Sequence, residues 1–188
     1  LITGSRVRQK IVEECHVKSV LIFCTSSAFE RHKRDSVLNT LFTNEKVLFE
    51  HAFESNPSLS DIVQISQKYR DISIDLIVGL GGGSAMDIAK IASVSIPAYR
   101  AGLHVNDLLN DSGLFSLVNE IDCIQVPTTA GTGSEVTPFA TVWDKASFKK
   151  YSLTGNSVYP YKAIVDPDLV VKDQRNEIAI STALDALN

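Results

Sequence analysis

The sequence predicts an α/β fold in which a parallel sheet is flanked by helices. Short apolar runs rich in β-branched residues alternate with segments whose apolar residues recur at helical spacing. The third such run leads into a cluster of glycines and then into another helical segment. This order favours parallel strands joined by right-handed crossovers, with ligands bound beyond the carboxyl ends of the strands. Thr25, Asn56 and Gly81 are all expected at that edge of the sheet.

The first part of the chain supplies two pairs of a strand and a helix. The first strand is indicated by the apolar run Val-Leu-Ile-Phe. The second helix has a defined start, because Ser58 and Asp61 have the spacing of a capping box and Ile62, Ile65 and Tyr69 follow at helical spacing. In order, we expect a strand at 17–23, a polar helix at 28–42, a strand at 46–53, a turn at 54–57 and a helix from 58.

The next stretch, residues 75–90, is the most distinctive part of the sequence. A buried strand at 76–78 is followed by glycines at four of the five positions 79–83. Ser84 is a suitable helix N-cap, and Asp87 stands where a capping box has its acid. The helix that follows should bury one apolar face, formed by Ala85, Ile88, Ala89 and Ala92.

A strand, a glycine loop and a helix N-terminus together predict an anion site. Glycines let a ligand approach the backbone, and the free N–H groups and the helix dipole attract phosphate. The stretch fits neither common phosphate-binding pattern, because Ser84 replaces the third glycine of G-x-G-x-x-G and no Gly-Lys-Ser/Thr of a P-loop follows. The sequence therefore indicates a phosphate cradle of another type, with a ligand-free strand-to-helix turn as the alternative.

A second polar loop follows the strand expected at 123–126. Residues 128–137 hold four threonines, a serine and two glycines, whose hydroxyl and N–H groups could bind phosphate, ribose or an amide. Alternatively, these side chains bond to the loop's own backbone. Around this loop we expect an irregular segment at 96–120, a hairpin of 139–144 with 150–153, a last strand at 163–167 and a helix at 177–188.

Composition excludes several classes of function. The chain has 188 residues and a formal net charge of −4, with no basic cluster that would indicate nucleic-acid binding. No apolar run is long enough to span a membrane, and the N-terminus lacks the pattern of a signal peptide. Three scattered cysteines favour reduced core thiols, and no histidine has metal-ligand spacing to another. We therefore expect a cytoplasmic protein that binds neither nucleic acid nor membrane.

Three stretches resemble the iron-containing (group III) alcohol dehydrogenase family. They are Gly-Gly-Gly-Ser-Ala-Met-Asp-Ile-Ala-Lys at 81–90, Pro-Thr-Thr-Ala-Gly-Thr-Gly-Ser-Glu-Val-Thr at 127–137 and Ala-Ile-Val-Asp-Pro-Asp-Leu at 163–169. Their order and approximate spacing also match, and Ser-Asn-Pro at 55–57 is similar to the family's Asn-Pro turn. The resemblance covers nearly the whole chain. It implies a Rossmann-like NAD(P)-binding domain over 1–176, of the dehydroquinate synthase-like fold, with 177–188 starting an all-helical metal-binding domain.

The resemblance also implies an activity and a set of cofactor contacts. Members interconvert a small alcohol and an aldehyde or ketone with NAD(P). Asp87 would face the nicotinamide carboxamide, since a carboxylate aimed at a diphosphate would be repelled, and helix capping is its alternative role. The other implied contacts are Gly82, Gly83 and Ser84 for the diphosphate, Thr128, Thr129 and Thr132 for the adenosine side, Asn56 near its ribose, Thr137 near the cofactor and Lys150 near a ribose. Lys150 could instead be a solvated lysine beside Lys149.

The end of the first strand bears on the choice of cofactor. NAD-preferring members place an acid near this point, whereas Cys-Thr-Ser-Ser at 24–27 is neutral. A carboxylate would repel a 2′-phosphate, and small hydroxyls such as that of Ser26 would not. We therefore expect NADP(H), or use of both cofactors.

The last helix resembles the family's metal-binding segment. Asp185 matches the metal-binding aspartate of a site that holds Fe²⁺, or Zn²⁺ in some members, as a Lewis acid. The family's next ligand, a histidine four residues later, falls beyond Asn188, and one carboxylate cannot hold a catalytic metal. No residue of this chain is assigned as a general acid or base. We expect a homodimer or higher homo-oligomer.

Two other functions compete with the dehydrogenase. One is a truncated, non-catalytic nucleotide-binding module, and the other is a dehydroquinate synthase-like lyase, which the residues of 128–137 disfavour. The substrate is less defined. Residues 137–144 and 149–153 are most similar to the phosphonoacetaldehyde reductase branch, with primary-alcohol, 1,2-propanediol and maleylacetate reductases as alternatives.

Overall fold

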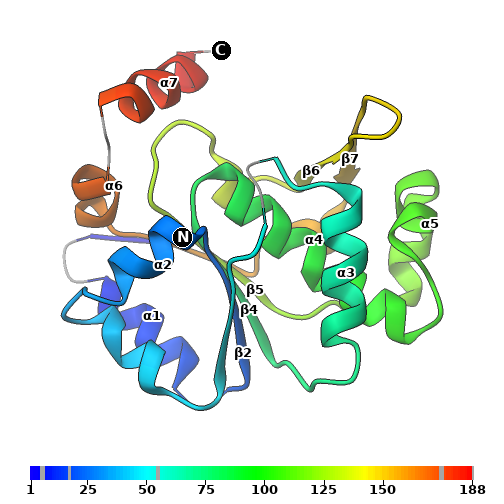
Figure 1. Cartoon of the computed structure of the whole chain (residues 1–188), viewed down its shortest axis with the longest axis horizontal. Helices are drawn as coiled ribbons and strands as arrows, with labels where there is room; N and C mark the ends of the chain where they lie inside the picture. Colours follow the sequence, from blue (N-terminus) through cyan, green and yellow to red (C-terminus); the bar gives the residue numbers. More distant parts are fainter. Residues whose placement is uncertain (5–6, 17, 54–55, 174–175, 188) are drawn as a thin grey trace.

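The protein is built on a six-stranded parallel sheet with the strand order β1-β8-β5-β4-β2-β3. Figure 1 labels the central strands β5, β4 and β2 of this sheet. The computed structural model describes residues 1–4, 7–16, 18–53, 56–173 and 176–187. All neighbouring strands of this sheet pair in parallel, as predicted. From edge to edge, the strands are β1 (Ile2–Thr3), β8 (Lys162–Val165), β5 (Cys123–Pro127), β4 (Leu76–Gly81), β2 (Val20–Phe23) and β3 (Val47–Glu50).

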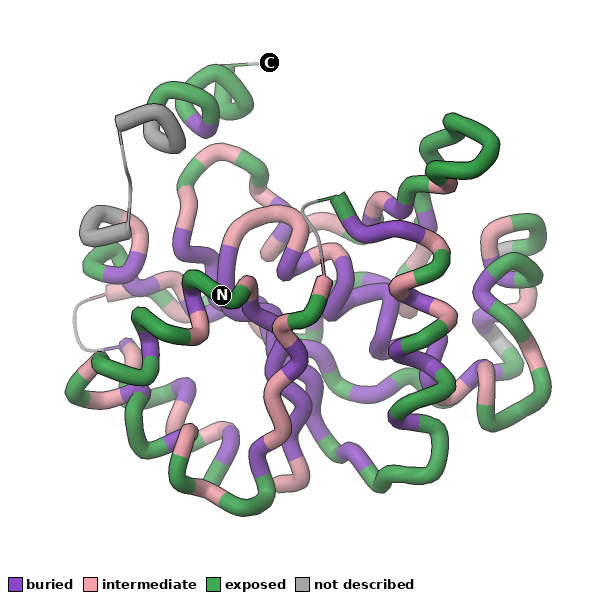
Figure 2. Tube along the Cα trace, in the orientation of Figure 1, coloured by how far each residue is buried: buried purple, intermediate pink, exposed green. Residues whose placement is uncertain are grey.

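Helices cover both faces of this sheet. One face packs Leu21 and Ile77 against α3 (Leu59–Tyr69), α4 (Gly83–Arg100) and α5 (Val105–Asn110). The other face packs Ile22 and Val78 against α1 (Arg8–Cys15), α2 (Ser26–His32), the 3₁₀ turn η1 (Leu38–Thr43) and α6 (Pro167–Asp173). Figure 2 shows the buried trace concentrated in the central strands and α4. Helix α7 (Asn176–Leu187) lies at the periphery, and its residues 180–187 are mostly exposed.

The predicted hairpin is confirmed. Strands β6 (Phe139–Asp144) and β7 (Lys149–Thr154) pair antiparallel as a separate two-stranded sheet. The capping box of α3 is also confirmed, because the Ser58 hydroxyl accepts the Asp61 N–H and the Asp61 carboxylate accepts the Ser58 N–H. The described part of the chain also includes the short 3₁₀ segments η2 (Ser112–Leu117), η3 (Ser134–Val136) and η4 (Asn156–Val158).

The start of α4 differs from the prediction. Strand β4 continues through the glycines to Gly81, and Gly82 is the N-cap in extended conformation with its carbonyl accepting the Met86 N–H. The prediction that Ser84 caps the helix and Asp87 closes a capping box was therefore wrong. A glycine without a side chain takes the cap position, so Ser84 and Asp87 lie inside the helix with their side chains available for other contacts.

The interpretation of 96–120 as irregular was also wrong. Helix α4 continues through Pro97 to Arg100, and α5 and η2 follow. Proline has no N–H to donate to the carbonyl of Ser93 one turn earlier. That carbonyl accepts the N–H of Ile121 instead, at 3.0 Å. A contact with a distant segment thus replaces the lost helical hydrogen bond.

The N-terminal part shows two further differences. The single helix expected at 28–42 is divided, because the Asp35 carboxylate accepts the N–H groups of Val37 and Leu38 and so starts a new turn. Elements β1 and α1 were not predicted. The turn expected at 54–57 includes residues 54 and 55, which lie outside the described ones. The helix expected at 177–188 likewise includes residue 188, which is not described.

The three cysteines are buried and unpaired. Burial raises the pKa of the Cys15, Cys24 and Cys123 thiols to about 12, so they stay protonated at neutral pH. This agrees with the predicted core thiols. Within the described part of the chain, none of the helices is both long enough and apolar enough to cross a bilayer.

Candidate functional site

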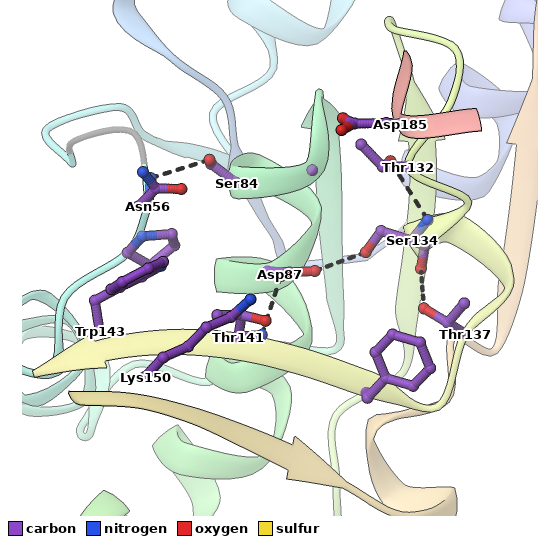
Figure 3. Close-up of a pocket in the computed structure, with 13 residues that line it drawn as sticks. Asn56, Ser84, Asp87, Thr132, Ser134, Thr137, Thr141, Trp143, Lys150 and Asp185 are labelled. Carbon is purple, nitrogen blue, oxygen red and sulfur yellow. Dashed lines mark hydrogen bonds between the residues drawn. The ribbon is translucent and has the colours of Figure 1, made fainter. Parts of the chain in front are cut away.

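Two cavities meet at the N-terminus of α4, at the carboxyl edge of the sheet. The first encloses about 330 Å³ and is shown in Figure 3. The second encloses about 270 Å³. Gly83 and Ser84 line both. The first cavity is also lined by Asn56, Pro57, Asp87, Thr132, Ser134, Thr137, Phe139, Thr141, Trp143, Lys150 and Asp185, and the second by Thr25, Ser27, Ala28, Arg31, Gly81, Gly82, Ala85, Thr128 and Thr129.

The amino end of α4 has the properties of an anion site. Its first N–H groups have no partner within the helix, and the dipoles of an 18-residue helix add a partial positive charge. The loop 128–137 crosses close to this end. A Cβ built on Gly82 would lie 3.1 Å from Thr129 Oγ1, and one on Gly83 would lie 3.3 Å from Thr132 Cγ2. The two glycines therefore let threonine hydroxyls and helix N–H groups face the same space, which suits a phosphate.

Asn56 joins the α3 side of the cleft to α4. Its backbone is left-handed, with φ of 61°, a conformation that asparagine tolerates better than most residues. Its N–H donates to the Ser84 hydroxyl at 3.1 Å. This contact ties Asn56, which lines the first cavity beside Pro57, to the start of α4.

Asp87 is held by two donors from the opposite wall. Its Oδ1 accepts the Ser134 hydroxyl at 2.7 Å, and its Oδ2 accepts the Thr141 N–H at 3.0 Å, as Figure 3 shows. Each carboxylate oxygen can accept a further hydrogen bond. Asp87 therefore presents a fixed acceptor to the first cavity, which fits an amide N–H₂ and repels phosphate.

Lys90, which sequence reasoning missed, lies behind Asp87. Its side chain is fully buried, and its ammonium is within 3.1 Å of four oxygens. Those acceptors are Ser134 Oγ, Thr137 Oγ1 and the backbone carbonyls of Thr137 and Phe139. Burial lowers the pKa of Lys90, whereas the nearby Asp87 charge opposes that shift. A lysine flanked by apolar residues in a helix of the core was the signal that could have found it.

The hairpin forms the far wall of the first cavity. Lys150 Nζ lies 5.6 Å from the centre of the Trp143 ring, so a cation and an aromatic face line the cavity together. Phe139 and Trp143 give this wall an apolar part, and both side chains are partly exposed. None of the three aromatic or hydroxyl residues Phe139, Thr141 and Trp143 was predicted as part of the site.

The structure gathers eleven of the twelve predicted site residues around Gly83 and Ser84. Asn56 and Thr132, expected on the adenosine side with Thr128 and Thr129, line the first cavity with Asp87 instead. Ser26 lines neither cavity, because its hydroxyl donates to the carbonyl of His51 at 3.1 Å. Its neighbours Thr25 and Ser27 reach the second cavity in its place.

Asp185 reaches the first cavity from α7. Gly131 lies against the Thr182 carbonyl, and a Cβ there would be 1.9 Å from that oxygen. The loop 128–137 and α7 therefore approach each other closely at a position that only glycine allows. Among the described residues, no group of three or more His, Cys, Asp or Glu side chains is arranged to hold a metal. Asp185 alone does not meet the ligand requirement of a catalytic metal.

Comparison with known proteins finds a matching family and several relatives. A family model described as "Iron-containing alcohol dehydrogenase" matches residues 1–167. A 1-propanol dehydrogenase of Salmonella typhimurium is 29% identical over 170 residues, which are 90% of this chain and 41% of the relative. A phosphonoacetaldehyde reductase of Streptomyces viridochromogenes is 35% identical over 133 residues, 67% of this chain and 32% of the relative. This chain therefore spans less than half the length of these curated relatives.

A solved structure extends the likeness to the fold. The iron-containing alcohol dehydrogenase from Thermotoga maritima superposes with a TM-score of 0.81 at 31% identity. The superposition covers 99% of this chain and 50% of that one. The resemblance and the fold class predicted from the sequence motifs are both confirmed by these matches.

The contact between Gly131 and Thr182 yields a prediction. Gly131→Ala should separate α7 from the loop, because its Cβ would overlap a backbone oxygen. Hydrogen exchange of the amides of 180–187 should then become at least about tenfold faster, as measured by mass spectrometry. Gly133→Ala is the matched control, since Gly133 has φ of 60° but nothing within 4 Å of its Cβ position. Equal exchange in the two variants would contradict this account of the contact.

Proposed function

This chain belongs to the iron-containing alcohol dehydrogenase family, and from that premise we propose that it is the cofactor-binding half of an NAD(P)-dependent oxidoreductase. The reaction would transfer a hydride between the nicotinamide and a small alcohol or aldehyde. The observation that carries this proposal is the junction of two cavities at the α4 N-terminus. An anion site between two cavities fits a molecule with a diphosphate at its centre.

Different residues of the two cavities would contact the different parts of such a dinucleotide. Gly82, Gly83 and Ser84 would hold the diphosphate. The cavity with Thr128 and Thr129 would take the adenosine half. The cavity with Asp87 would take the nicotinamide half, with Thr132, Thr137, Asn56 and Lys150 around it.

The chain's own side chains would bind and orient the cofactor. The carboxylate of Asp87 would accept the carboxamide N–H₂, which fixes the rotation of the nicotinamide ring about its glycosidic bond. When bound, the nicotinamide supplies the hydride chemistry at C4. We assign no general acid or base among the described residues, and no step to a metal, because no group of three or more His, Cys, Asp or Glu side chains among them is arranged to hold one. We propose that 1–176 form the cofactor domain and that 177–188 begin a helical metal-binding domain.

The second cavity supports NADP(H) as the preferred cofactor. Thr25, Ser27 and Arg31 line it, and the residues described as lining it include no Asp or Glu. An acid at this edge of a Rossmann-type sheet binds the ribose 2′-hydroxyl of NAD, whereas an arginine accommodates a 2′-phosphate. We propose that Arg31 contacts that phosphate, with Thr25 and Ser27 beside it.

The relatives support a narrower substrate class. We propose that the substrate is a small aldehyde carrying a phosphonate, because the chain is 35% identical to a phosphonoacetaldehyde reductase over two thirds of its length. Simple short-chain alcohols are the alternative, since a 1-propanol dehydrogenase is 29% identical. We also propose that the protein works in the cytoplasm as a homo-oligomer. Its three free buried thiols support the cytoplasm.

The phosphate assignment can be tested by titrating NADPH into the chain and following protein fluorescence or heat. Ser84→Asp should weaken binding at least about tenfold, since it places a carboxylate beside the diphosphate. Ser84→Asn, of the same shape without the charge, should stay within about threefold of the unmodified chain. Equal binding by the Asp and Asn variants would remove the diphosphate from this helix end.

The cofactor preference can be tested at Arg31. Arg31→Ala should lower the ratio of NADPH to NADH affinity by about tenfold, because a charge-assisted contact to the 2′-phosphate is lost. Arg34→Ala is the matched control, because Arg34 lies nearby but does not line the second cavity. An unchanged ratio in Arg31→Ala, or an equal fall in both variants, would count against the 2′-phosphate contact.

The substrate can be tested by assaying the full gene product with NADPH. We expect kcat/KM for phosphonoacetaldehyde to exceed that for propionaldehyde by at least about tenfold, since a phosphonate adds charged contacts. Equal values would remove the phosphonate branch. Cofactor binding with no turnover of either aldehyde would instead favour a non-catalytic nucleotide-binding module.

A further inference from the structure

We propose that Lys90 is a positioning residue that sets the direction of the Asp87 carboxylate through the Ser134 hydroxyl. This inference rests on the proposed function, in which Asp87 accepts the carboxamide of a nicotinamide cofactor. Lys90 itself does not line either cavity. Its effect on the cofactor would therefore pass through the residues that it holds.

The chemistry of the three groups fixes the direction of each hydrogen bond. Lys90 Nζ lies 2.9 Å from Ser134 Oγ, and Ser134 Oγ lies 2.7 Å from Asp87 Oδ1. An ammonium only donates and a carboxylate only accepts. The Ser134 hydroxyl must therefore accept from Lys90 and donate to Asp87. A serine hydroxyl can otherwise rotate freely. Between these two charges, the Ser134 hydroxyl donates only toward Asp87.

The second oxygen of Asp87 depends on the same lysine by another route. Its Oδ2 accepts the N–H of Thr141, on strand β6. Lys90 also binds the carbonyls of Thr137 and Phe139, which lead into that strand. Both donors to Asp87 thus belong to the segment 134–141, which the Lys90 ammonium ties to α4. Asp87 and Lys90 lie three residues apart on α4, so helix and segment enclose the carboxylate between them.

A purely structural role would not need a lysine at this position. A fully buried ammonium is costly to desolvate, and an apolar residue would fill the same volume in a helix otherwise surrounded by core. The four oxygens around Nζ offset that cost, and all belong to the wall of the first cavity. The buried charge therefore serves the orientation of this wall.

The test compares two probes that differ at the carboxamide alone: NADP⁺ and its 3-acetylpyridine analogue, in which a methyl replaces the N–H₂. Affinities are measured by calorimetry on the 188-residue chain, and the readout is their ratio. We expect the unmodified chain to prefer NADP⁺ by about tenfold and Asp87→Ala to lose that preference. Ser134→Ala and Lys90→Met should each bring the ratio to within about threefold of Asp87→Ala. Lys68→Met, which removes the ion pair between the exposed Lys68 and the buried Glu50 and lines neither cavity, should keep the original ratio.

The outcomes separate the inference from its premise. No binding of either probe by the unmodified chain would overturn the proposed function and this inference together. Binding without preference, or a preference that survives Ser134→Ala, would overturn this inference and leave the cofactor site intact. An equal loss of affinity for both probes, with the ratio kept, would assign Lys90 and Ser134 a structural role only. Should Lys90→Met fail to fold, Ser134→Ala decides, because it keeps the ammonium and three of its acceptors.

Discussion

The burial of helix α4 is the constraint on which the rest of the molecule depends. Twelve of its 18 residues are buried, between the central strand β4 and the hairpin, so its position has little freedom. A helix held this way must place its amino end where the preceding strand ends. Gly82 and Gly83 leave that end open to solvent and to the threonine loop. The candidate anion site is thus a consequence of how the core is packed, because the helix cannot satisfy its own first N–H groups.

The same helix organises the chemistry of the cleft. Ser84, Asp87 and Lys90 follow one another at three-residue spacing. Ser84 bonds to Asn56, whereas Asp87 and Lys90 both bond to the segment 134–141. Ser84 holds the turn at Asn56, Asp87 meets strand β6, and Lys90 holds the start of that strand. Three polar side chains on one buried helix therefore bring together segments that are far apart in sequence. The geometry of the first cavity depends on these contacts more than on any loop alone.

The sequence predicted that the candidate site residues would lie together, because parallel strands end at a common edge. The glycine run and the threonine run each follow an apolar strand, so their meeting could be predicted from the pattern alone. The roles of Ser84 and Asp87 could not, because capping rules favour serine and do not foresee that Gly82 takes the cap. Lys90 was missed for a related reason, since pattern reading assigns lysine to the solvent face. The continuation of α4 through Pro97 was not predicted either, because the lost helical hydrogen bond is replaced by one from Ile121, which lies far away in the sequence.

The proposed function depends on a diphosphate bound at the amino end of α4. The most direct measurement is an ¹⁵N–¹H spectrum of the chain titrated with NADPH. We expect the amides of Gly82, Gly83 and Ser84 to shift most, with smaller changes at Thr129 and Thr132. Saturable binding that leaves those three amides unmoved, with the shifts centred elsewhere on the sheet edge, would contradict it.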